Sequence, residues 1–235
     1  MPIPFLPSHD ETTPFPQVET ALDEPNGLLM AGGALSPARL VAAYRSGIFP
    51  WFEEGEPILW WSPDPRCVLW PEDLKVKRSL AKTIRRGHLQ VSEDTCFARI
   101  MENCAAPRRG SRGTWITSGM IDAYSRLSEL GLAHSVEVWQ EDELVGGLYG
   151  VQVGRIFVGE SMFSRVTDAS KVALVHLAGS MGYALIDCQL STPHLESLGA
   201  VNIPRSQYKD LLDRFGDLTE RVIVPGQRDV DISTA

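Results

Sequence analysis

Glu160 is a charged residue on an otherwise apolar face of a predicted strand, residues 155–163. Strict alternation along this strand would place its side chain on one face with Ile156, Val158 and Met162. A carboxylate on an apolar face is costly unless it is paired or lies in a cleft, so Glu160 is a candidate site residue. The alternative is a structural salt bridge, for example with Arg165 or Arg155.

Asp187 and Gln189 form a second polar pair, at the end of a predicted strand over residues 184–189. Residues two apart on a strand project to the same side, so Cys188 would face the other side. A carboxylate beside an amide can orient an amine nucleophile and accept a hydrogen bond from it. The sequence contains no Ser/His/Asp grouping, HExxH or paired-carboxylate motif. The chemistry indicated is therefore positioning and electrostatics.

Five glycines fall within residues 146–159: Gly146, Gly147, Gly150, Gly154 and Gly159. Glycine weakens a strand, so this density indicates bulges or the close approach of a ligand to the backbone. A bulge at Gly159 would bring Phe157 to the same pocket as Glu160. An irregular hairpin is the alternative, since neither a GxGxxG nor a GxxxxGK[ST] phosphate motif occurs here.

The basic residues are concentrated in one segment of an acidic chain. The whole chain has a net charge of −8, yet residues 75–112 carry ten Lys and Arg against three acidic residues, which gives +7. Such a segment is typical of one surface that meets a polyanion. The alternative is a solvated basic face without a partner.

Cysteine usage and apolar runs exclude several classes of protein. The four cysteines form no CxxC pair and no histidine lies at ligand spacing beside them, so we expect reduced thiols and no zinc site. No apolar run approaches the ~20 residues that span a bilayer. The first residues carry no Lys or Arg before an apolar stretch, so no signal peptide is predicted and a cytoplasmic protein is expected.

The elements that must position these residues have a mixed α+β order. An extended arm of about 20 residues precedes a helix that Ser36 caps and Gly47 ends. Residues 48–71 hold four tryptophans and are hard to fit into a regular sheet or helix, so we expect these side chains to line a wall or an interdomain cleft. The alternative is that Trp60, Trp61 and Trp70 are simply core. Further helices are predicted over 77–86, 94–104, 117–130, 168–181 and 204–215, with a three-stranded meander over 134–139, 143–151 and 155–163.

The chain also carries a series of longer motifs in order: EPNGLLMAGGALSPARLVAAYRSGIFPWF, PILWWSPDPRCVLWP, GTWIT, ELVGGLYGV, GESMFS, SK, LIDCQ and HLESLGA. Together they resemble the leucyl/phenylalanyl-tRNA–protein transferases over about residues 15–208. The resemblance implies a small N-terminal domain, residues 1–64. It also implies a larger catalytic domain, residues 65–235, similar to N-acetyltransferases, in which helices flank a central, mostly antiparallel sheet.

The resemblance implies an aminoacyltransferase. Such enzymes move leucine or phenylalanine from charged tRNA to the α-amino group of proteins with N-terminal Arg or Lys, which marks them for degradation by the bacterial N-degron route. The aminoacyl ester is already activated, so no cofactor or metal is expected. The expected partners are the two charged tRNAs and the protein substrates, without a membrane, and a monomer is expected.

Site residues carry over onto matching positions. Trp51 in IFPWF and Trp115 in GTWIT resemble aromatics that stack on the terminal adenosine of the tRNA. The pocket for the aminoacyl side chain would include Leu148, Phe157 and Met162. At the reaction centre, Gln189, held by Asp187, would accept a hydrogen bond from the attacking amine, and Glu160 would favour a cationic acceptor. A basic helix for the acceptor stem would present Arg78, Lys82, Arg85 and Arg86.

Two other functions remain open at this point. An enzyme of similar fold that uses acyl-coenzyme A is one, although the chain lacks the Q/R-x-x-G-x-G/A pyrophosphate loop that such enzymes use. A tRNA-binding adaptor without catalysis is the other, and it would leave Glu160, Asp187 and Gln189 without a task. Arg66, Arg155 and His194 receive no assignment from sequence.

Overall fold

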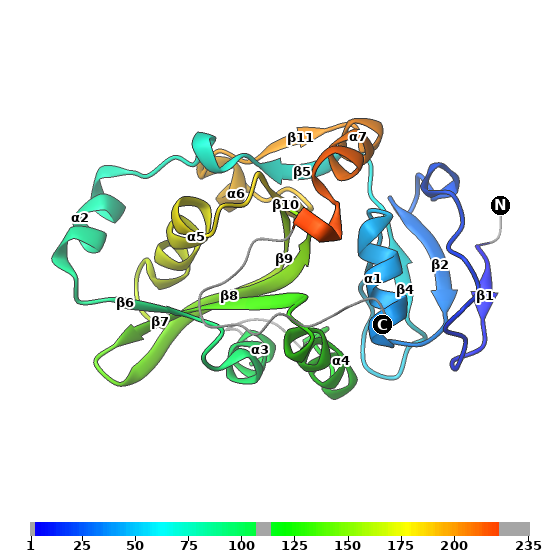
Figure 1. Cartoon of the computed structure of the whole chain (residues 1–235), viewed down its shortest axis with the longest axis horizontal. Helices are drawn as coiled ribbons and strands as arrows, with labels where there is room; N and C mark the ends of the chain where they lie inside the picture. The colour runs from blue at the N-terminus through cyan, green and yellow to red at the C-terminus, as the bar shows by residue number, and fades with distance from the viewer. Residues whose placement is uncertain (1–2, 107–113, 221–235) are drawn as a thin grey trace.

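The strands form two sheets of unequal size in the computed structural model, which describes residues 3–106 and 114–220 (Figure 1). The smaller sheet has the order β1-β2-β4-β3. Its strands are β1 (Phe5–Leu6), β2 (Leu28–Gly32), β3 (Phe49–Pro50) and β4 (Leu59–Trp61). It lies at the right of Figure 1, and α1 (Pro37–Arg45) lies between it and the rest of the molecule.

The larger sheet has seven strands in the order β11-β5-β10-β9-β8-β7-β6. All neighbouring pairs are antiparallel except β9 and β10, which run parallel. The strands are β5 (Arg66–Leu69), β6 (Gln90–Glu93), β7 (Ala133–Gln140), β8 (Glu143–Val153), β9 (Ile156–Ser164), β10 (Leu185–Gln189) and β11 (Val201–Ile203). The predicted α+β class with a mostly antiparallel sheet is confirmed.

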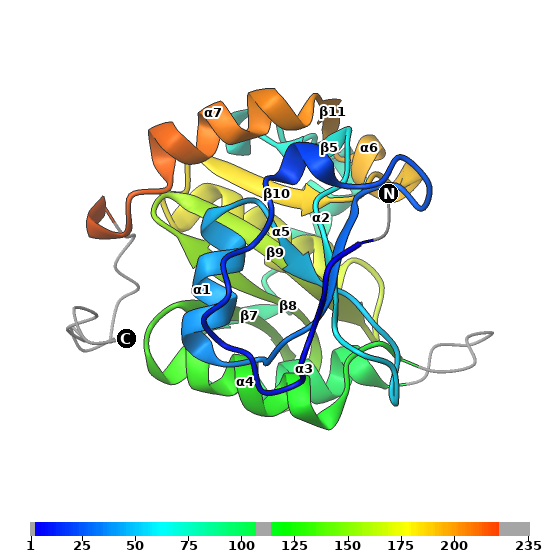
Figure 2. The ribbon, with the colours of Figure 1, turned by 90° about the vertical axis from the view of Figure 1, so that its right-hand side faces the viewer.

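Helices cover both faces of this sheet, as Figure 2 shows from the side. Helices α3 (Phe97–Ala105) and α4 (Ser118–Glu129) lie on one face, and α5 (Ala169–Ser180) lies on the other. At the end of the molecule opposite the small sheet is α2 (Arg78–Arg86). The remaining helices are α6 (Pro193–Ser197), α7 (Arg205–Phe215) and three short 3₁₀ turns, at Val18–Thr20, Pro71–Asp73 and Leu218–Glu220.

Local signals set the helix ends much as predicted. The Ser36 hydroxyl accepts a hydrogen bond from Arg39 N at 3.4 Å, and Pro37 occupies the first position of α1. The Thr117 hydroxyl accepts from Met120 N at 3.2 Å and begins α4. These caps satisfy backbone N–H groups that have no partner inside the helix, so short polar motifs were sufficient to predict both starts.

The tryptophan-rich stretch departs from the prediction, because it contains regular strands. Trp60 and Trp61 lie in β4, which pairs with β2 on one side and β3 on the other. The Trp60 ring is fully buried and its Nε1 donates to the Gly32 carbonyl oxygen at 2.8 Å. A buried indole needs such an acceptor, and it comes from a distant segment that periodicity does not reveal. The alternative of a core role is confirmed for Trp60.

One hydrophobic cluster joins the two sheets. It includes Leu40 and Trp60 from the first 64 residues together with Met120, Tyr124 and Val158 from the larger unit. The small unit therefore packs on the larger one through a shared core, and the division into residues 1–64 and 65–235 stays a prediction. Residues 221–235 lie outside the described ranges.

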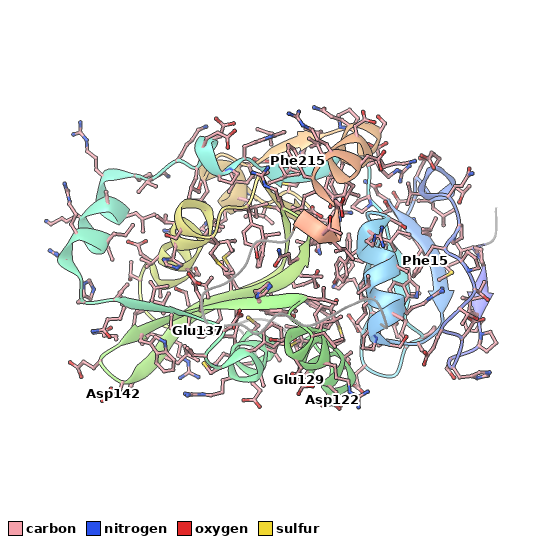
Figure 3. The ribbon with its side chains drawn as sticks, in the orientation of Figure 1. Phe15, Asp122, Glu129, Glu137, Asp142 and Phe215 are labelled. Atoms are coloured by element: carbon pink, nitrogen blue, oxygen red, sulfur yellow. The ribbon has the colours of Figure 1, made fainter. Side chains whose placement is uncertain are left out.

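Asp122 and Glu129 lie on the outer side of α4, away from the sheet (Figure 3). Within the described ranges, no helix is long and apolar enough to cross a bilayer.

Candidate active site

A bulge in β9 decides how Glu160 is presented. Gly150 of β8 pairs with Gly159, whereas the preceding Tyr149 pairs with Ser161, so Glu160 is the extra residue between two paired positions. Ile156 and Val158 belong to the cluster under α3 and α4, and Met162 packs against the cluster under α5. The predicted bulge is confirmed. The prediction that Met162 shares a face with Ile156 and Val158 is wrong, because the extra residue reverses the alternation.

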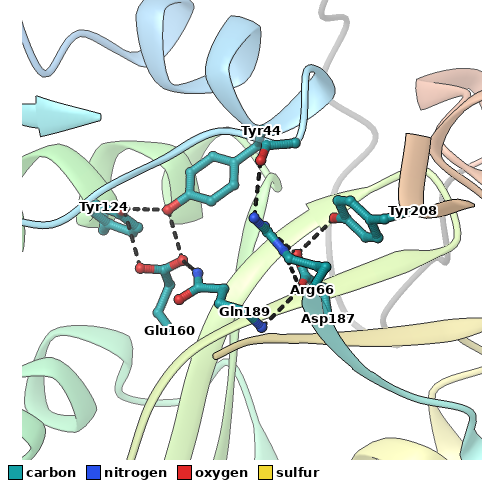
Figure 4. Close-up of polar contacts among 8 residues, drawn as sticks. Tyr44, Arg66, Tyr124, Glu160, Asp187, Gln189 and Tyr208 are labelled. Carbon is teal, nitrogen blue, oxygen red and sulfur yellow. Dashed lines mark hydrogen bonds and ion pairs between the residues drawn. The ribbon is translucent and has the colours of Figure 1, made fainter. Parts of the chain in front are cut away.

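Glu160 is 9% exposed and lies among two tyrosines and an amide (Figure 4). Its Oε1 accepts from Tyr44 Oη at 2.8 Å and from Gln189 Nε2 at 2.7 Å, and Tyr124 Oη lies 3.4 Å from Oε2. Burial raises the pKa of Glu160 to about 7, although the bonds from Tyr44 and Gln189 act in the opposite direction. Burial also raises the pKa of both tyrosine hydroxyls, so they remain donors.

The salt-bridge interpretation of Glu160 is wrong. Arg165 donates to Asn103 Oδ1, and the Arg155 guanidinium lies over the ring of Phe215. Neither arginine forms an ion pair with Glu160 in the described part of the chain. Glu160 is thus a buried carboxylate without a paired cation, and its burial keeps its proton affinity high although the donated hydrogen bonds oppose this effect.

Asp187 is completely enclosed. Arg66 binds it through two hydrogen bonds, from Nε to Oδ1 at 2.9 Å and from Nη2 to Oδ2 at 2.7 Å. Tyr208 Oη donates to Oδ2 at 2.7 Å, and the backbone N of Gln189 donates to Oδ1 at 2.9 Å. Asp187 and Arg66 are 0% and 1% exposed. The Asp187 carboxylate therefore holds the backbone N–H of Gln189 in place.

Gln189 is the residue through which the two polar groups meet. β10 is irregular between Asp187 and Gln189 where it pairs with β5, and Gln189 has φ 62°, in the left-handed region. Its amide donates to Glu160, which orients the side chain so that its carbonyl oxygen is the acceptor for a further group. Cys188 packs against the cluster under α5 and, like Gln189, lines the cavity described next.

A cavity of about 660 Å³ opens where β9 and β10 separate. The two strands pair only as far as Val158 and Asp187, and the residues that follow line the cavity. One wall is apolar and is formed by Leu148, Phe157, Met162, Leu174, Leu177 and Ile186. The polar edge is formed by Glu160 and Gln189, with Thr192 and His194 farther along. This combination suits a ligand with an apolar side chain and a polar reacting group.

The glycines of the meander mostly make room for protein rather than for a ligand. A Cβ on Gly150 would lie 2.2 Å from the Val158 carbonyl oxygen and 2.6 Å from the Phe157 ring. One on Gly146 would lie 2.5 Å from the Ala169 side chain. The prediction of a bulge is confirmed. At Gly146 and Gly150, close packing against other parts of the protein explains the glycine, not the approach of a ligand.

The two tryptophans assigned by the resemblance have different surroundings. Trp115 lines the cavity and is half-buried. Trp51 is 43% exposed, does not line the cavity, and lies 5.6 Å from Trp61 between ring centroids. Trp61 Nε1 donates to the Trp51 carbonyl oxygen at 2.7 Å, so the exposed ring is carried on an ordered segment.

The four cations predicted to bind tRNA lie on α2, and all of them are exposed. Leu80 is the buried residue that attaches this helix to the rest of the protein. Arg108, Arg109 and Arg112, which also belong to the basic segment, lie outside the described residues. In the described ranges, no three His, Cys, Asp or Glu side chains group as metal ligands, and all four cysteines are free thiols.

Sequence patterns alone did not identify four residues of the site: Tyr44, Arg66, Tyr124 and Tyr208. Tyr44 and Tyr124 lie on the buried faces of α1 and α4, and nothing in a helical pattern marks a hydroxyl that reaches a carboxylate. Arg66 stands directly before the apolar residues 67–69, and this position could have marked it, because an arginine buried beside such a run needs a partner.

Comparison with known proteins agrees with these features. Residues 68–213 match the family described as leucyl/phenylalanyl-tRNA protein transferase, and residues 33–64 match the N-terminal domain of that family. A leucyl/phenylalanyl-tRNA–protein transferase of Nitrosomonas europaea is 59% identical over 92% of this chain and 90% of its own. One of Stutzerimonas stutzeri is 60% identical over 84% of this chain and 89% of its own.

Among solved structures, a GCN5-related N-acetyltransferase from Kribbella flavida has a TM-score of 0.37 at 9% identity, over 74% of this chain and 63% of that one. The relatives at 59% and 60% identity extend across most of this chain and most of their own length. The chain belongs to the leucyl/phenylalanyl-tRNA–protein transferase family of aminoacyltransferases.

Proposed function

We propose that this protein transfers leucine or phenylalanine from charged tRNA to the α-amino group of proteins that begin with arginine or lysine, and so marks them for degradation. The observation that carries the proposal is the cavity between β9 and β10, which has an apolar wall and a polar edge made by Glu160 and Gln189. An adaptor that only binds tRNA would not need a buried carboxylate with a perturbed pKa beside such a cavity.

The aminoacyl side chain occupies the apolar wall in this proposal. Leu148 and Phe157 are buried and Met162 is half-buried, so an apolar side chain that enters between them leaves water without exposing a polar group. Trp115 at the same cavity and the exposed Trp51 offer flat faces on which the terminal adenosine can stack, which is worth about 1–3 kcal/mol per base.

The α-amine of the acceptor approaches the ester carbonyl beside Gln189. It must be neutral to attack, and a free α-amino group has a pKa of about 7.7–8.0, so only a minority is ready at neutral pH. The Gln189 carbonyl oxygen accepts a hydrogen bond from this amine and aligns its lone pair with the carbonyl carbon. The C–N bond forms as the ester C–O bond breaks, and the departing ribose oxygen takes up the proton that the amine loses and becomes a hydroxyl.

Glu160 supplies negative charge at the edge of the cavity in this scheme. Its carboxylate attracts the cationic arginine or lysine at the start of the acceptor, and it holds the Gln189 amide through Nε2. Because its pKa is about 7, the ionised fraction changes across the physiological range. Asp187 has no contact with the cavity and acts through Gln189.

Transfer of radiolabelled leucine from purified leucyl-tRNA to a peptide with N-terminal arginine tests the proposal. We expect transfer to this peptide, and none to the same peptide with an acetylated N-terminus. Gln189→Ala should lower kcat about 10–100-fold with little change in tRNA binding, because it removes the group that aligns the amine. Gln140→Ala, at an exposed position at the end of β7, is the matched control.

Tight tRNA binding without transfer would support the adaptor and contradict the proposal. Competition by coenzyme A in the same assay would favour the acyl-coenzyme A enzyme. If Gln189→Ala transfers leucine as fast as the wild type, the role given to Gln189 is wrong even though the reaction stands.

A further inference from the structure

The carboxylate of Asp187 has no capacity left for a substrate. It accepts four hydrogen bonds, two from Arg66, one from Tyr208 and one from the backbone of Gln189, and an ionised carboxylate offers about four acceptor sites. Its side chain is 0% exposed. Asp187 therefore acts through the residues that it holds, and the group that determines where it lies is Arg66.

Arg66 occupies a site that only a guanidinium fits. Two of its nitrogens bind both oxygens of Asp187, and the third, Nη1, donates to the Gly47 carbonyl oxygen at 3.0 Å. Its guanidinium carbon lies 4.9 Å from the centre of the Phe49 ring and 4.7 Å from that of Tyr208. A planar guanidinium can form the two parallel hydrogen bonds to Asp187 and also stack against the two rings, whereas the ammonium group of lysine cannot do both.

The contacts of Arg66 join two parts of the site that are far apart in sequence. Gly47 and Phe49 belong to the segment that leads directly to Trp51, and they come from the small N-terminal unit. Asp187 holds Gln189, whose left-handed φ of 62° needs a restraint. Gly47 itself packs on Tyr208, since a Cβ there would lie 3.2 Å from the tyrosine ring. Figure 4 shows the Asp187 carboxylate held by Arg66 on one side and by the Tyr208 hydroxyl on the other.

We propose that Arg66 and Tyr208 are positioning residues that hold Asp187, and through it Gln189, in register with the segment 47–51. The inference rests on the proposed function and deepens it. Gln189, which aligns the amine, lies at the end of β10. Arg66 keeps this strand end at a fixed distance from the segment that carries Trp51. Tyr208 contributes a hydroxyl that donates one of the four hydrogen bonds to Asp187.

Two variants separate positioning from folding. Tyr208→Phe keeps the ring against Gly47 and Arg66 and removes only the hydroxyl on Asp187. We expect kcat for leucine transfer to fall about tenfold, with the Kd for leucyl-tRNA within about twofold, because a small displacement of an aligning group is costly. Arg66→Lys should lower kcat about 100-fold and also raise that Kd severalfold, since it loses the Gly47 contact as well.

Arg39→Lys is the matched control. Arg39 is also buried and stacked, over Phe15 and Trp60, but it has no contact with Asp187 or Gln189. It should lower the urea midpoint while kcat per folded molecule stays at the wild-type value. The shape of the kcat–pH profile should be the same in Tyr208→Phe as in the wild type, because only the alignment of Gln189 changes.

The kcat of the double variant Arg66→Lys, Tyr208→Phe should be only slightly lower than that of Arg66→Lys alone, since both residues act through one carboxylate. Wild-type kcat in Tyr208→Phe, or fully multiplicative losses in the double variant, would overturn the inference. If Arg66→Lys does not fold, Tyr208→Phe decides alone. Absence of transfer by the wild-type protein is the distinct outcome that would overturn the proposed function and this inference with it.

Discussion

Replacement of Glu160 by glutamine should make the protein more stable, and increasingly so as the pH rises. The carboxylate is 9% exposed, and burial raises its pKa from 4.5 to about 7. The folded protein therefore binds this proton more tightly than the unfolded chain does. The stability that this proton provides is complete below pH 4.5 and is lost as the pH rises through 7.

The size of the effect follows from the shift. At ~1.4 kcal/mol per pKa unit, ionisation of Glu160 costs the folded state about 3 kcal/mol at high pH. Glutamine is neutral and nearly the same shape, and its amide can still accept from Tyr44 and pair with Gln189. The free energy of unfolding of Glu160→Gln relative to the wild type should thus rise by about 2–3 kcal/mol between about pH 5 and about pH 8.

Urea unfolding at several pH values measures this difference, with tryptophan fluorescence as the signal. Glu129→Gln is the control, because Glu129 is an exposed glutamate on the outer side of α4 (Figure 3) and does not line the cavity, so its substitution should have a much smaller effect. A stability difference for Glu160→Gln that is the same at every pH, or that shrinks as the pH rises, would refute the reasoning.

Three further predictions concern the surface, the cavity and the meander. Arg78→Gln with Lys82→Gln on the exposed α2 should weaken tRNA binding and reduce the slope of log K against log salt by about 1–2, which a salt titration of binding measures. Leu148→Phe narrows the cavity, so competition between the two charged tRNAs should show phenylalanine transfer reduced about tenfold relative to leucine. Gly150→Ala should destabilise the protein by about 1–3 kcal/mol in thermal or urea unfolding, because its Cβ would meet the Val158 carbonyl oxygen.

Much of the fold could be predicted because its signals are local. The caps at Ser36 and Thr117 and the alternation in the meander each depend on residues within a few positions of one another. The strands that the sequence did not predict, β4 and β5 among them, are short. They become strands through partners that lie elsewhere in the chain, and no period of four residues or fewer can indicate such pairing.

For the site, the sequence by itself determined which residues we propose for the chemistry: Glu160 on an apolar strand face, Asp187 and Gln189 at a strand end, and a basic helix. Only the tertiary structure decided how they meet. Glu160 bonds to Tyr44, 116 residues away, and Asp187 bonds to Arg66, 121 residues away. The bulge that separates Met162 from Ile156 and Val158 likewise depends on the register between β8 and β9. Register and long-range pairing are set by how whole elements pack, so they leave no mark in the local pattern of residues.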